Sequence, residues 1–581
     1  MDVFALFSAR VATAMQLLFP QVGADLLARI VVEPPRDTAH GDLSTNAAMV
    51  VAKPLGKNPR EVATALVEHF KADPDVVSVE IAGPGFINFR LANPIWHQVL
   101  RSIATNRADY GRSNLGGGEA VNIEYVSANP TGPMHVGHTR GAVFGDTLAA
   151  LMDYSGFKVT REYYINDAGS QIDTLARSTF LRYREALGET IEIPSGFYPG
   201  DYLIPVGEAL KAEFGDSLLS RPESEVTPIV KDRVLAAMLE LIKSDLAQLN
   251  IHHDVFFSER TLHGQGGDID TTLDWLREKG MVYEGRLEAP KGKTPEEWED
   301  REQTLFRATD FGDDIDRPLI KSDGSYTYFA ADIAYHRNKF LRGFTHMINV
   351  LGADHSGYVK RLQAATKAVS LNEADMDVRI CQLVRLLKNG EPFKMSKRSG
   401  DLVTLADVVE EVGADATRFM LMYRRNDAAM DFDFALVKEQ TKDNPVFYVQ
   451  YAHARAYSIF KTALRDLPAL DVSPEALANA DIELIQSSAE LDLVRVLAAW
   501  PRTVTAAAIA HEPHRIAFYV HELAAAFHGF WAKGKDDPSL RFVNADQPEL
   551  TLARLALVDS VRQVIVNALD ILGVSAPEEL S

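Results

Sequence analysis

The sequence predicts an α/β protein whose parallel-sheet core follows a small N-terminal α+β domain and precedes a C-terminal all-α helical bundle. Three observations support this fold class. A short apolar run at Val121–Val126 is followed by a helical pattern at Met134–Leu151, the strand-loop-helix order from which parallel sheets are built. Val77–Leu91 contains two alternating runs around a Gly-Pro-Gly turn, which is typical of a hairpin. Residues 445–581 have helical periodicity almost throughout, so we expect a bundle there.

Composition limits the class of protein. The chain has 581 residues, 46% of them hydrophobic, which is enough for several packed domains. No run approaches the roughly 18 apolar residues of a membrane span, and the start MDVFALFSAR has no signal-peptide pattern. The single cysteine, Cys381, excludes an intramolecular disulfide, so we expect a soluble cytoplasmic protein without a membrane partner. A net charge of −21 argues against nonspecific coating of nucleic acid, and any RNA must meet local basic patches.

We expect three domains, at residues 1–107, 118–425 and 445–581. The first begins with an amphipathic helix, since apolar residues recur at helical spacing from Val3 to Leu18. A glycine run, Gly116 to Gly118, marks the boundary before the core. A stretch rich in Asp and Lys, Asn426–Asn444, leads into the helical domain.

The stretch from Val121 to Asp146 is the strongest candidate for a functional site. Its loop follows a strand and precedes a helix whose first N–H groups are free to attract phosphate. His135 and His138 are three residues apart and share one helical face, and Gly137 between them lets a ring or a phosphate approach the backbone. Taken alone, two such histidines are as consistent with a surface pair or half of a zinc site as with a phosphate-binding site. Zinc is disfavoured because the loop offers no third ligand.

Further strands and one helix are expected along the core. Phe157–Ile165 reads as a strand, and Val226–Leu249 as a helix within a polar insertion at 178–301 whose role the sequence leaves open. His252 and His253 precede Asp254, but adjacent side chains on a strand face opposite ways, so we expect no metal there.

The second half of the sheet is predicted to begin with a strand at Gln303–Phe306 and to continue with one at Tyr326–Ala331. Asp332 would then lie at the carboxyl end of a strand, where open parallel sheets bind ligands. The alternative is that Asp332 caps a helix beginning at Ile333. A last strand, His346–Leu351, leads into a candidate binding loop that starts at Gly352.

A basic loop, PFKMSKRSG, spans Pro392 to Gly400. Its cations Lys394, Lys397 and Arg398, flanked by serines, could close on a polyphosphate. For an isolated motif of this kind a solvated basic turn is the default interpretation.

The two motifs together resemble those of class I aminoacyl-tRNA synthetases. PMHVGH is similar to their HIGH signature and KMSKR to their KMSKS loop, with Arg398 in place of the usual serine. We expect this replacement to tune loop closure without abolishing it. Longer strings resemble the arginyl-tRNA synthetases across essentially the whole chain: AHGDLSTNAAM from Ala39, AGPGFINF from Ala82, ANPTGPMHVGH from Ala128, SYTYFAADIAYH from Ser325, GADH from Gly352 and NPVFYVQYAHAR from Asn444.

This resemblance implies a Rossmann-like core that ligates L-arginine to tRNA(Arg) through an arginyl-adenylate, using ATP with Mg²⁺ and releasing AMP and pyrophosphate. It also implies a monomer without a tightly bound protein metal. The implied catalytic residues are His135, His138, Lys394 and Lys397. Those expected at ATP are Asn129, Pro130, Thr131, Gly132, Pro133, Met134, Val136, Gly137, Gly352, Asp354, His355, Met395 and Ser396. Those expected at arginine are Glu124, Ser127, Asn129, Tyr328 and Asp332.

An aromatic and basic run in the helical domain, Tyr448, Tyr451, His453 and Arg455, is the candidate tRNA contact, because such groups can stack on unpaired bases. Core packing is the alternative for the tyrosines. Two rival functions also stay open: another amino-acid specificity within the same class, and a catalytically silent tRNA-binding protein. The intact phosphate-binding motifs weigh against the second rival.

Overall fold

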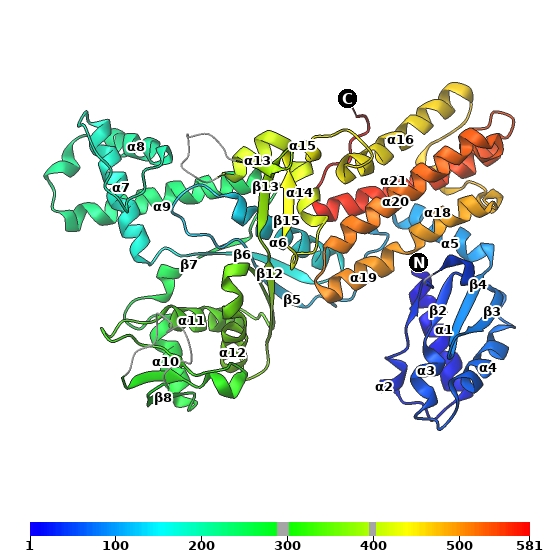
Figure 1. Ribbon diagram of the computed structural model, residues 1–581, viewed down its shortest axis with the longest axis horizontal. Coiled ribbons are helices and arrows are strands. Elements are labelled where there is room, and N and C mark those ends of the chain that lie inside the picture. Colours follow the sequence, from blue (N-terminus) through cyan, green and yellow to red (C-terminus); the bar gives the residue numbers. More distant parts are fainter. Residues whose placement is uncertain (36, 288–300, 394–402, 581) are drawn as a thin grey trace. The chain divides into compact units, whose positions relative to one another are not determined.

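The computed structural model describes residues 1–35, 37–287, 301–393 and 403–580, and the chain divides into two compact units. One unit is Asn114–Glu439, and the other combines Met1–Ser113 with Gln440–Ser581 (Figure 1).

A five-stranded parallel sheet is the centre of the unit 114–439. Its strand order is β12-β11-β5-β6-β7, and every neighbouring pair is parallel. Because β6 and β7 extend from one side of β5 and β11 and β12 from the other, the topological switch point lies between β5 and β11. Crevices outside the carboxyl ends at such a point are the usual ligand sites of open α/β sheets. The strands are β5 (Ala120–Glu124), β6 (Lys158–Ile165), β7 (Val255–Ser258), β11 (His346–Gly352) and β12 (Asp375–Cys381).

Helices connect these strands (Figure 1). α6 joins β5 to β6, and α12 joins β11 to β12. α6 fits closely against the sheet because Gly145 has no side chain where the ring of Tyr125 lies. The helices of this part are α6 (Val136–Tyr154), α7 (Ser170–Ala186), α8 (Ile204–Phe214), α9 (Glu223–Ala247), α10 (Asp268–Glu278), α11 (Tyr328–Leu341) and α12 (Val359–Val369).

The structure confirms the strands predicted near 121, 157 and 346 and the helices predicted near 134 and 226. The prediction that Gln303–Phe306 begins the second half of the main sheet is wrong. This strand, β9, pairs with β8 (Val282–Gly285) and β10 (Arg317–Pro318) in a separate antiparallel sheet. A short apolar run indicates a strand but does not identify its partner.

The strand predicted at Tyr326–Ala331 is also wrong, because these residues enter and begin α11. Thr327 is the N-cap, and its hydroxyl accepts a hydrogen bond from the Ala330 amide at 3.3 Å. Asp332 therefore lies in the second turn of α11 and does not cap the helix. Short apolar runs fit a strand or a helix equally well, and the threonine cap decides between them.

A third sheet and three short helices complete this unit. β13 (Val384–Lys388) pairs in parallel with β15 (Met430–Asp433) and antiparallel with β14 (Glu391–Pro392). The helices are α13 (Leu405–Val412), α14 (Ala414–Met422) and α15 (Phe434–Val437).

The other unit combines an antiparallel sheet with helices. The predicted hairpin is confirmed as β3 and β4, which meet at the Gly-Pro-Gly turn, and the sheet order is β1-β2-β4-β3. The indole of the buried Trp500 donates a hydrogen bond to the Tyr110 carbonyl at 2.9 Å, so the two chain segments share one core. The strands are β1 (Val32–Glu33), β2 (Leu43–Thr45), β3 (Val76–Ala82) and β4 (Phe86–Leu91), and the N-terminal helices are α1 (Val3–Leu18), α2 (Ala24–Leu27), α3 (Ala47–Ala52), α4 (Pro59–Phe70) and α5 (Asn93–Asn106).

The predicted C-terminal bundle is confirmed. Its apolar stretch Ser488–Ala510 is the one part of the described chain that has the length and composition of a membrane span, but it is half buried and divided into two helices. Such a stretch is equally typical of a protein core. The helices are α16 (Pro445–Asp466), α17 (Pro474–Ala478), α18 (Ser488–Ala498), α19 (Trp500–Ala510), α20 (His514–Asp536) and α21 (Pro548–Leu572).

A buried histidine predicts how stability depends on pH. The ring of His253 lies 4.2 Å from that of Tyr125 and 5.5 Å from that of Tyr163, centroid to centroid. Burial lowers the pKa of His253 from 6.5 to about 4. Between these values the unfolded chain binds a proton that the folded chain does not, so the free energy of unfolding should fall as pH decreases from 6.5 towards 4.

Denaturation of the wild type and of His253→Phe at pH 7.5, 6.5 and 5.5 measures this contribution. We expect the variant to lose less stability than the wild type between pH 6.5 and 5.5, by up to about 1.4 kcal/mol per pH unit. Equal losses in both proteins would show that His253 is not the titrating group.

Candidate functional site

Two histidines shape the N-terminus of α6. His135 is the N-cap, and its Nδ1 accepts a hydrogen bond from the Gly137 amide at 3.1 Å. The Nδ1 of His138 accepts from the His135 amide at 3.4 Å, and the two rings stack with centroids 3.8 Å apart. In a neutral imidazole with an accepting Nδ1, the proton is on Nε2. Both rings therefore carry an Nε2–H donor at the helix end. The expectation of free N–H groups there is wrong, because the Val136, Gly137 and His138 amides are already hydrogen-bonded within the protein.

Burial keeps these two rings neutral. It lowers the pKa of His135, and it lowers that of His138 to about 4 with a further contribution from His135. Asp354, in the loop after β11, acts in the opposite direction on the pKa of His138, so the two loops are electrostatically coupled. At neutral pH the histidines are hydrogen-bond donors without charge, and a bound polyphosphate would stabilise their protonated forms.

The loop between β5 and α6 is strained. Val126 and Ser127 have φ angles of 71° and 43°. Residues other than glycine rarely adopt positive φ angles, and a β-branched residue such as Val126 especially disfavours them. The Ser127 hydroxyl donates to Glu124 Oε1 at 3.1 Å and accepts from the Tyr164 amide at the same distance. Strain of this kind persists where neighbours fix it and is common in ligand sites.

The rest of this loop is also anchored. The Tyr202 hydroxyl donates to the Thr131 carbonyl at 2.7 Å, and the Met134 amide donates to Asp245 Oδ2 at 3.0 Å. The side-chain amide of Asn129 donates from Nδ2 to Gln171 Oε1 at 3.0 Å. The predicted ATP-binding residues between Asn129 and Gly137 thus form one continuous strap at the carboxyl end of β5.

The segment after the KMSKR motif lies against the same strap. The Val136 amide donates to the Val403 carbonyl at 3.0 Å, and the Leu405 amide donates to the Met134 carbonyl at 2.8 Å. Lys394, Met395, Ser396 and Lys397 lie outside the described residues. The chain that follows them is nevertheless fixed beside the histidine pair.

A cavity of about 240 Å³ opens at the switch point of the sheet. Of the predicted arginine-binding residues, Glu124, Tyr328 and Asp332 line it, whereas Ser127 and Asn129 do not. His355, from the loop that begins at Gly352, lines it too. The other lining residues are Tyr164, Asn166, Glu259, Ala331, Tyr335, His336, Asn349, Leu351, Tyr358 and Leu362.

Glu259 is a carboxylate of this cavity that the sequence analysis missed. It follows β7 as Glu124 ends β5, so its place after a parallel strand was the available signal. Burial raises the pKa of Glu259, while its hydrogen bond with His263, at 3.3 Å, opposes that rise. Together with Glu124 and Asp332 it gives the cavity three carboxylates.

A buried charge network lies beneath the cavity. The fully buried Lys339 Nζ contacts Glu124 Oε2 at 2.6 Å and Asn349 Oδ1 at 3.3 Å. Arg342 donates twice to Glu162, at 2.7 and 2.8 Å, and the Tyr335 hydroxyl donates once at 2.7 Å. Although burial acts to raise it, the pKa of Glu162 is lowered by these partners. The network joins α11 to three strands of the sheet.

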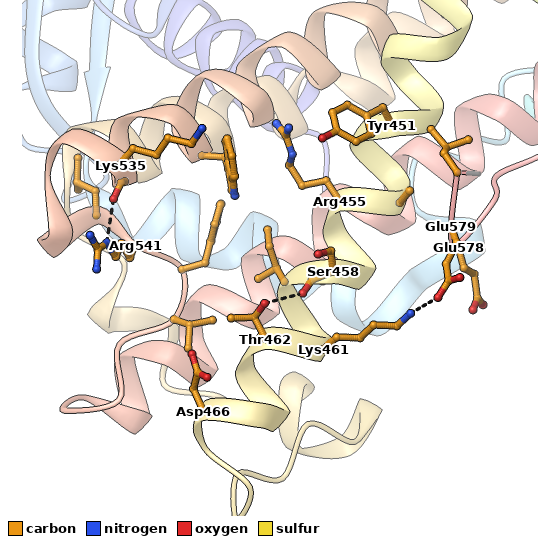
Figure 2. Close-up of a pocket in the computed structure, with 18 residues that line it drawn as sticks. Tyr451, Arg455, Ser458, Lys461, Thr462, Asp466, Lys535, Arg541, Glu578 and Glu579 are labelled. Carbon is orange, nitrogen blue, oxygen red and sulfur yellow. Dashed lines mark hydrogen bonds and ion pairs between the residues drawn. The ribbon is translucent and has the colours of Figure 1, made fainter. Parts of the chain in front are cut away.

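A second, larger cavity of about 840 Å³ lies in the helical bundle, between α16, α20 and the end of the chain (Figure 2). Of the four residues proposed to contact tRNA, Tyr451 and Arg455 line this C-terminal pocket. His453 is buried in the bundle and its Nδ1 donates to the Pro577 carbonyl at 2.8 Å, while Tyr448 packs against the ring of His528. Helical periodicity placed the run on α16 but did not separate its inner and outer faces.

Comparisons with known proteins identify the class. The model described as "tRNA synthetases class I (R), catalytic domain" matches residues 100–195 and 232–440. The models for the "Arginyl tRNA synthetase N terminal domain" and the "DALR anticodon binding domain" match 6–91 and 449–580. The parallel-sheet unit is therefore that of a class I aminoacyl-tRNA synthetase.

Full-length relatives identify the family. The chain is 61% identical to an arginine–tRNA ligase of Rhizobium etli and 58% identical to one of Methylorubrum extorquens, with 100% of each chain covered. The arginyl-tRNA synthetase of Thermus thermophilus has the same fold, with a TM-score of 0.72, 21% identity and all of both chains covered. This chain belongs to the arginyl-tRNA synthetase family.

Gly137 provides a test of the histidine arrangement. A Cβ on Gly137 would lie 2.8 Å from Cε1 and 3.0 Å from Nδ1 of His135, so Gly137→Ala should push the ring from its capping position. We expect the rate of arginine-dependent ATP–pyrophosphate exchange to fall by about tenfold. Gly141→Ala is the matched control, since a Cβ there meets only Val350, at 4.0 Å. Equal rates in the two variants would contradict the role of the His135 ring.

Proposed function

We propose that this protein ligates L-arginine to tRNA(Arg) in two steps, through an arginyl-adenylate. The observation that carries the proposal is the carboxylate-lined cavity at the switch point of a class I synthetase core. ATP enters as its magnesium complex, with the ion held chiefly by the phosphates. As family resemblance implies, the protein acts as a cytoplasmic monomer.

In the first step an arginine carboxylate oxygen attacks the α-phosphorus of ATP in line, and pyrophosphate leaves. The Nε2–H groups of His135 and His138 supply donors for the phosphate oxygens, and the positive end of the α6 dipole attracts them. Lys394 and Lys397 add positive charge from the KMSKR loop. Positioning and charge neutralisation carry most of the rate, as in other phosphoryl chemistry.

Arginine is selected by the carboxylates of the cavity. A guanidinium is planar, always charged and has five N–H donors but no acceptor, so its site needs oriented acceptors. Asp332 and Glu259 take this role, with Tyr328 beside them. Glu124, whose charge Lys339 already balances, receives the α-ammonium group.

In the second step the terminal adenosine of tRNA attacks the carbonyl carbon of the adenylate, and AMP leaves. Family resemblance assigns the attack to the 2′-hydroxyl. Tyr451 and Arg455 in the C-terminal pocket contact the tRNA, and the N-terminal domain supplies a further contact.

ATP–pyrophosphate exchange tests the function against both rivals. The assay is run with each amino acid, with and without tRNA(Arg) transcript. We expect exchange with arginine alone among the amino acids, and esterification of tRNA(Arg). Exchange with another amino acid would indicate a different specificity. Tight tRNA binding with no exchange for any amino acid would identify a catalytically silent protein.

Substitution of the cavity carboxylates tests arginine recognition. We expect Asp332→Asn and Glu259→Gln each to raise the arginine KM more than about tenfold and to leave the ATP KM unchanged, because a desolvated guanidinium loses a charged partner. Thr327→Ala is the matched control: loss of this N-cap costs about 1 kcal/mol of stability and should leave the arginine KM intact. A normal arginine KM in both carboxylate variants would exclude them from the site.

A further inference from the structure

A buried histidine connects the C-terminal pocket to the helix behind it. Nη1 of Arg455 on α16 lies 2.6 Å from Nδ1 of His528 on α20, and His528 Nε2 lies 3.1 Å from the Tyr448 carbonyl. A guanidinium has no acceptor, so Nδ1 must accept and Nε2 must carry the proton that it donates to the carbonyl. The two neighbours thus fix a single neutral tautomer of His528.

Two aromatic rings hold the same guanidinium. Arg455 Cζ lies 4.5 Å from the ring centroid of Tyr451 and 4.0 Å from that of Trp531. Figure 2 shows the Arg455 guanidinium beside the Tyr451 side chain among the residues that line the pocket. An arginine side chain normally has considerable rotamer freedom, which is lost when it binds a ligand. Here one hydrogen bond and two rings have already restricted it, while most of its five N–H donors stay free of His528.

The charges of the pocket make this orientation important. Four cations line it, but so do three carboxylates, and Lys461 is paired with Glu579 at the chain end (Figure 2). The lining cations are Arg455, Lys461, Lys535 and Arg541, and the carboxylates are Asp466, Glu578 and Glu579. Attraction of a polyanion by net charge alone is therefore weak here. Affinity can come instead from a donor that is already held in one direction, because binding then costs less side-chain entropy.

We propose that His528 is a positioning residue for tRNA binding, which presents Arg455 as a preoriented donor to a hydrogen-bond acceptor of the RNA in the C-terminal pocket. The acceptor is a phosphate oxygen or the edge of an unpaired base. This inference rests on the proposed function, which brings tRNA to the pocket. Burial, with a contribution from Arg455, lowers the pKa of His528 to about 4, so the accepting Nδ1 persists at neutral pH.

Two substitutions of His528 separate positioning from packing. His528→Leu removes the acceptor, and we expect the tRNA KM to rise roughly tenfold, the factor that a charge-assisted hydrogen bond contributes. His528→Gln keeps an acceptor for Arg455 and a donor for the carbonyl, so it should restore most of the affinity. The maximal rate at saturating tRNA and the arginine KM should stay unchanged. His521→Leu is the control on the same helix. It removes another ring that packs against Tyr448, at 5.4 Å between centroids, but it leaves the His528 acceptor in place, so the tRNA KM should stay close to that of the wild type.

A double-mutant cycle with Arg455→Ala decides the question. If His528 acts through Arg455, His528→Leu should raise the tRNA KM no further in the Arg455→Ala background. Fully additive effects, or a wild-type tRNA KM in His528→Leu, would overturn the proposal while the wild type still charges tRNA. A wild type that neither charges nor binds tRNA would overturn the proposed function itself.

Salt dependence identifies the acceptor. If Arg455 contacts a phosphate, Arg455→Ala should reduce the slope of log Kd against log salt by about one. If it contacts a base edge, the slope should stay nearly constant, and the variant should lose discrimination between the natural transcript and one with a changed anticodon base. If neither the salt slope nor the discrimination between transcripts changes, Arg455 does not touch the RNA.

Discussion

The buried contact between Lys339 and Glu124 is the interaction on which the unit 114–439 depends. It connects α11 to the end of β5, and the same ammonium reaches Asn349 on β11, so one side chain spans the switch point. Charges this deeply buried are costly to separate. Loss of one partner leaves an uncompensated buried ion, which lowers the free energy of unfolding by about 3–5 kcal/mol. The position of Asp332, two helical turns earlier on α11, follows from the same anchor. This ion pair between α11 and the sheet therefore fixes the helix that carries Asp332 relative to the strand that carries Glu124.

Neutral histidines recur as oriented hydrogen-bonding groups in this protein. At the N-terminus of α6 backbone amides make each Nδ1 an acceptor and leave Nε2–H for a ligand. In the C-terminal pocket a guanidinium does the same to His528. In both places burial lowers the pKa of the ring, so its proton stays where the neighbours put it. A solvated histidine would exchange tautomers and lose this direction.

The sequence was sufficient for the parts of the structure that depend on local pattern. The strand-loop-helix stretch from Val121 to Asp146 and the helical bundle follow from periodicity, prolines and glycines. It was insufficient where a single capping residue or a tertiary contact decides. Asp332 lies on a helix because Thr327 caps the chain before it. Glu259 lines the cavity only because of the order of strands in the sheet. His453 is buried in the bundle, although Arg455, two residues later, lines the pocket. The positive φ of Val126 and Ser127 has no local signature, since neither residue favours it.

An acidic chain that binds RNA must use its few accessible cations efficiently. With a net charge of −21, long-range electrostatic repulsion opposes the approach of tRNA, so affinity has to come from short-range contacts. Such contacts are strongest when the protein groups are already ordered, because the complex then loses little side-chain entropy. Arg455, held by two rings and a histidine, meets this condition, whereas Lys461, exposed and paired with Glu579, does not. The contribution of each cation therefore depends more on how firmly it is held than on its charge.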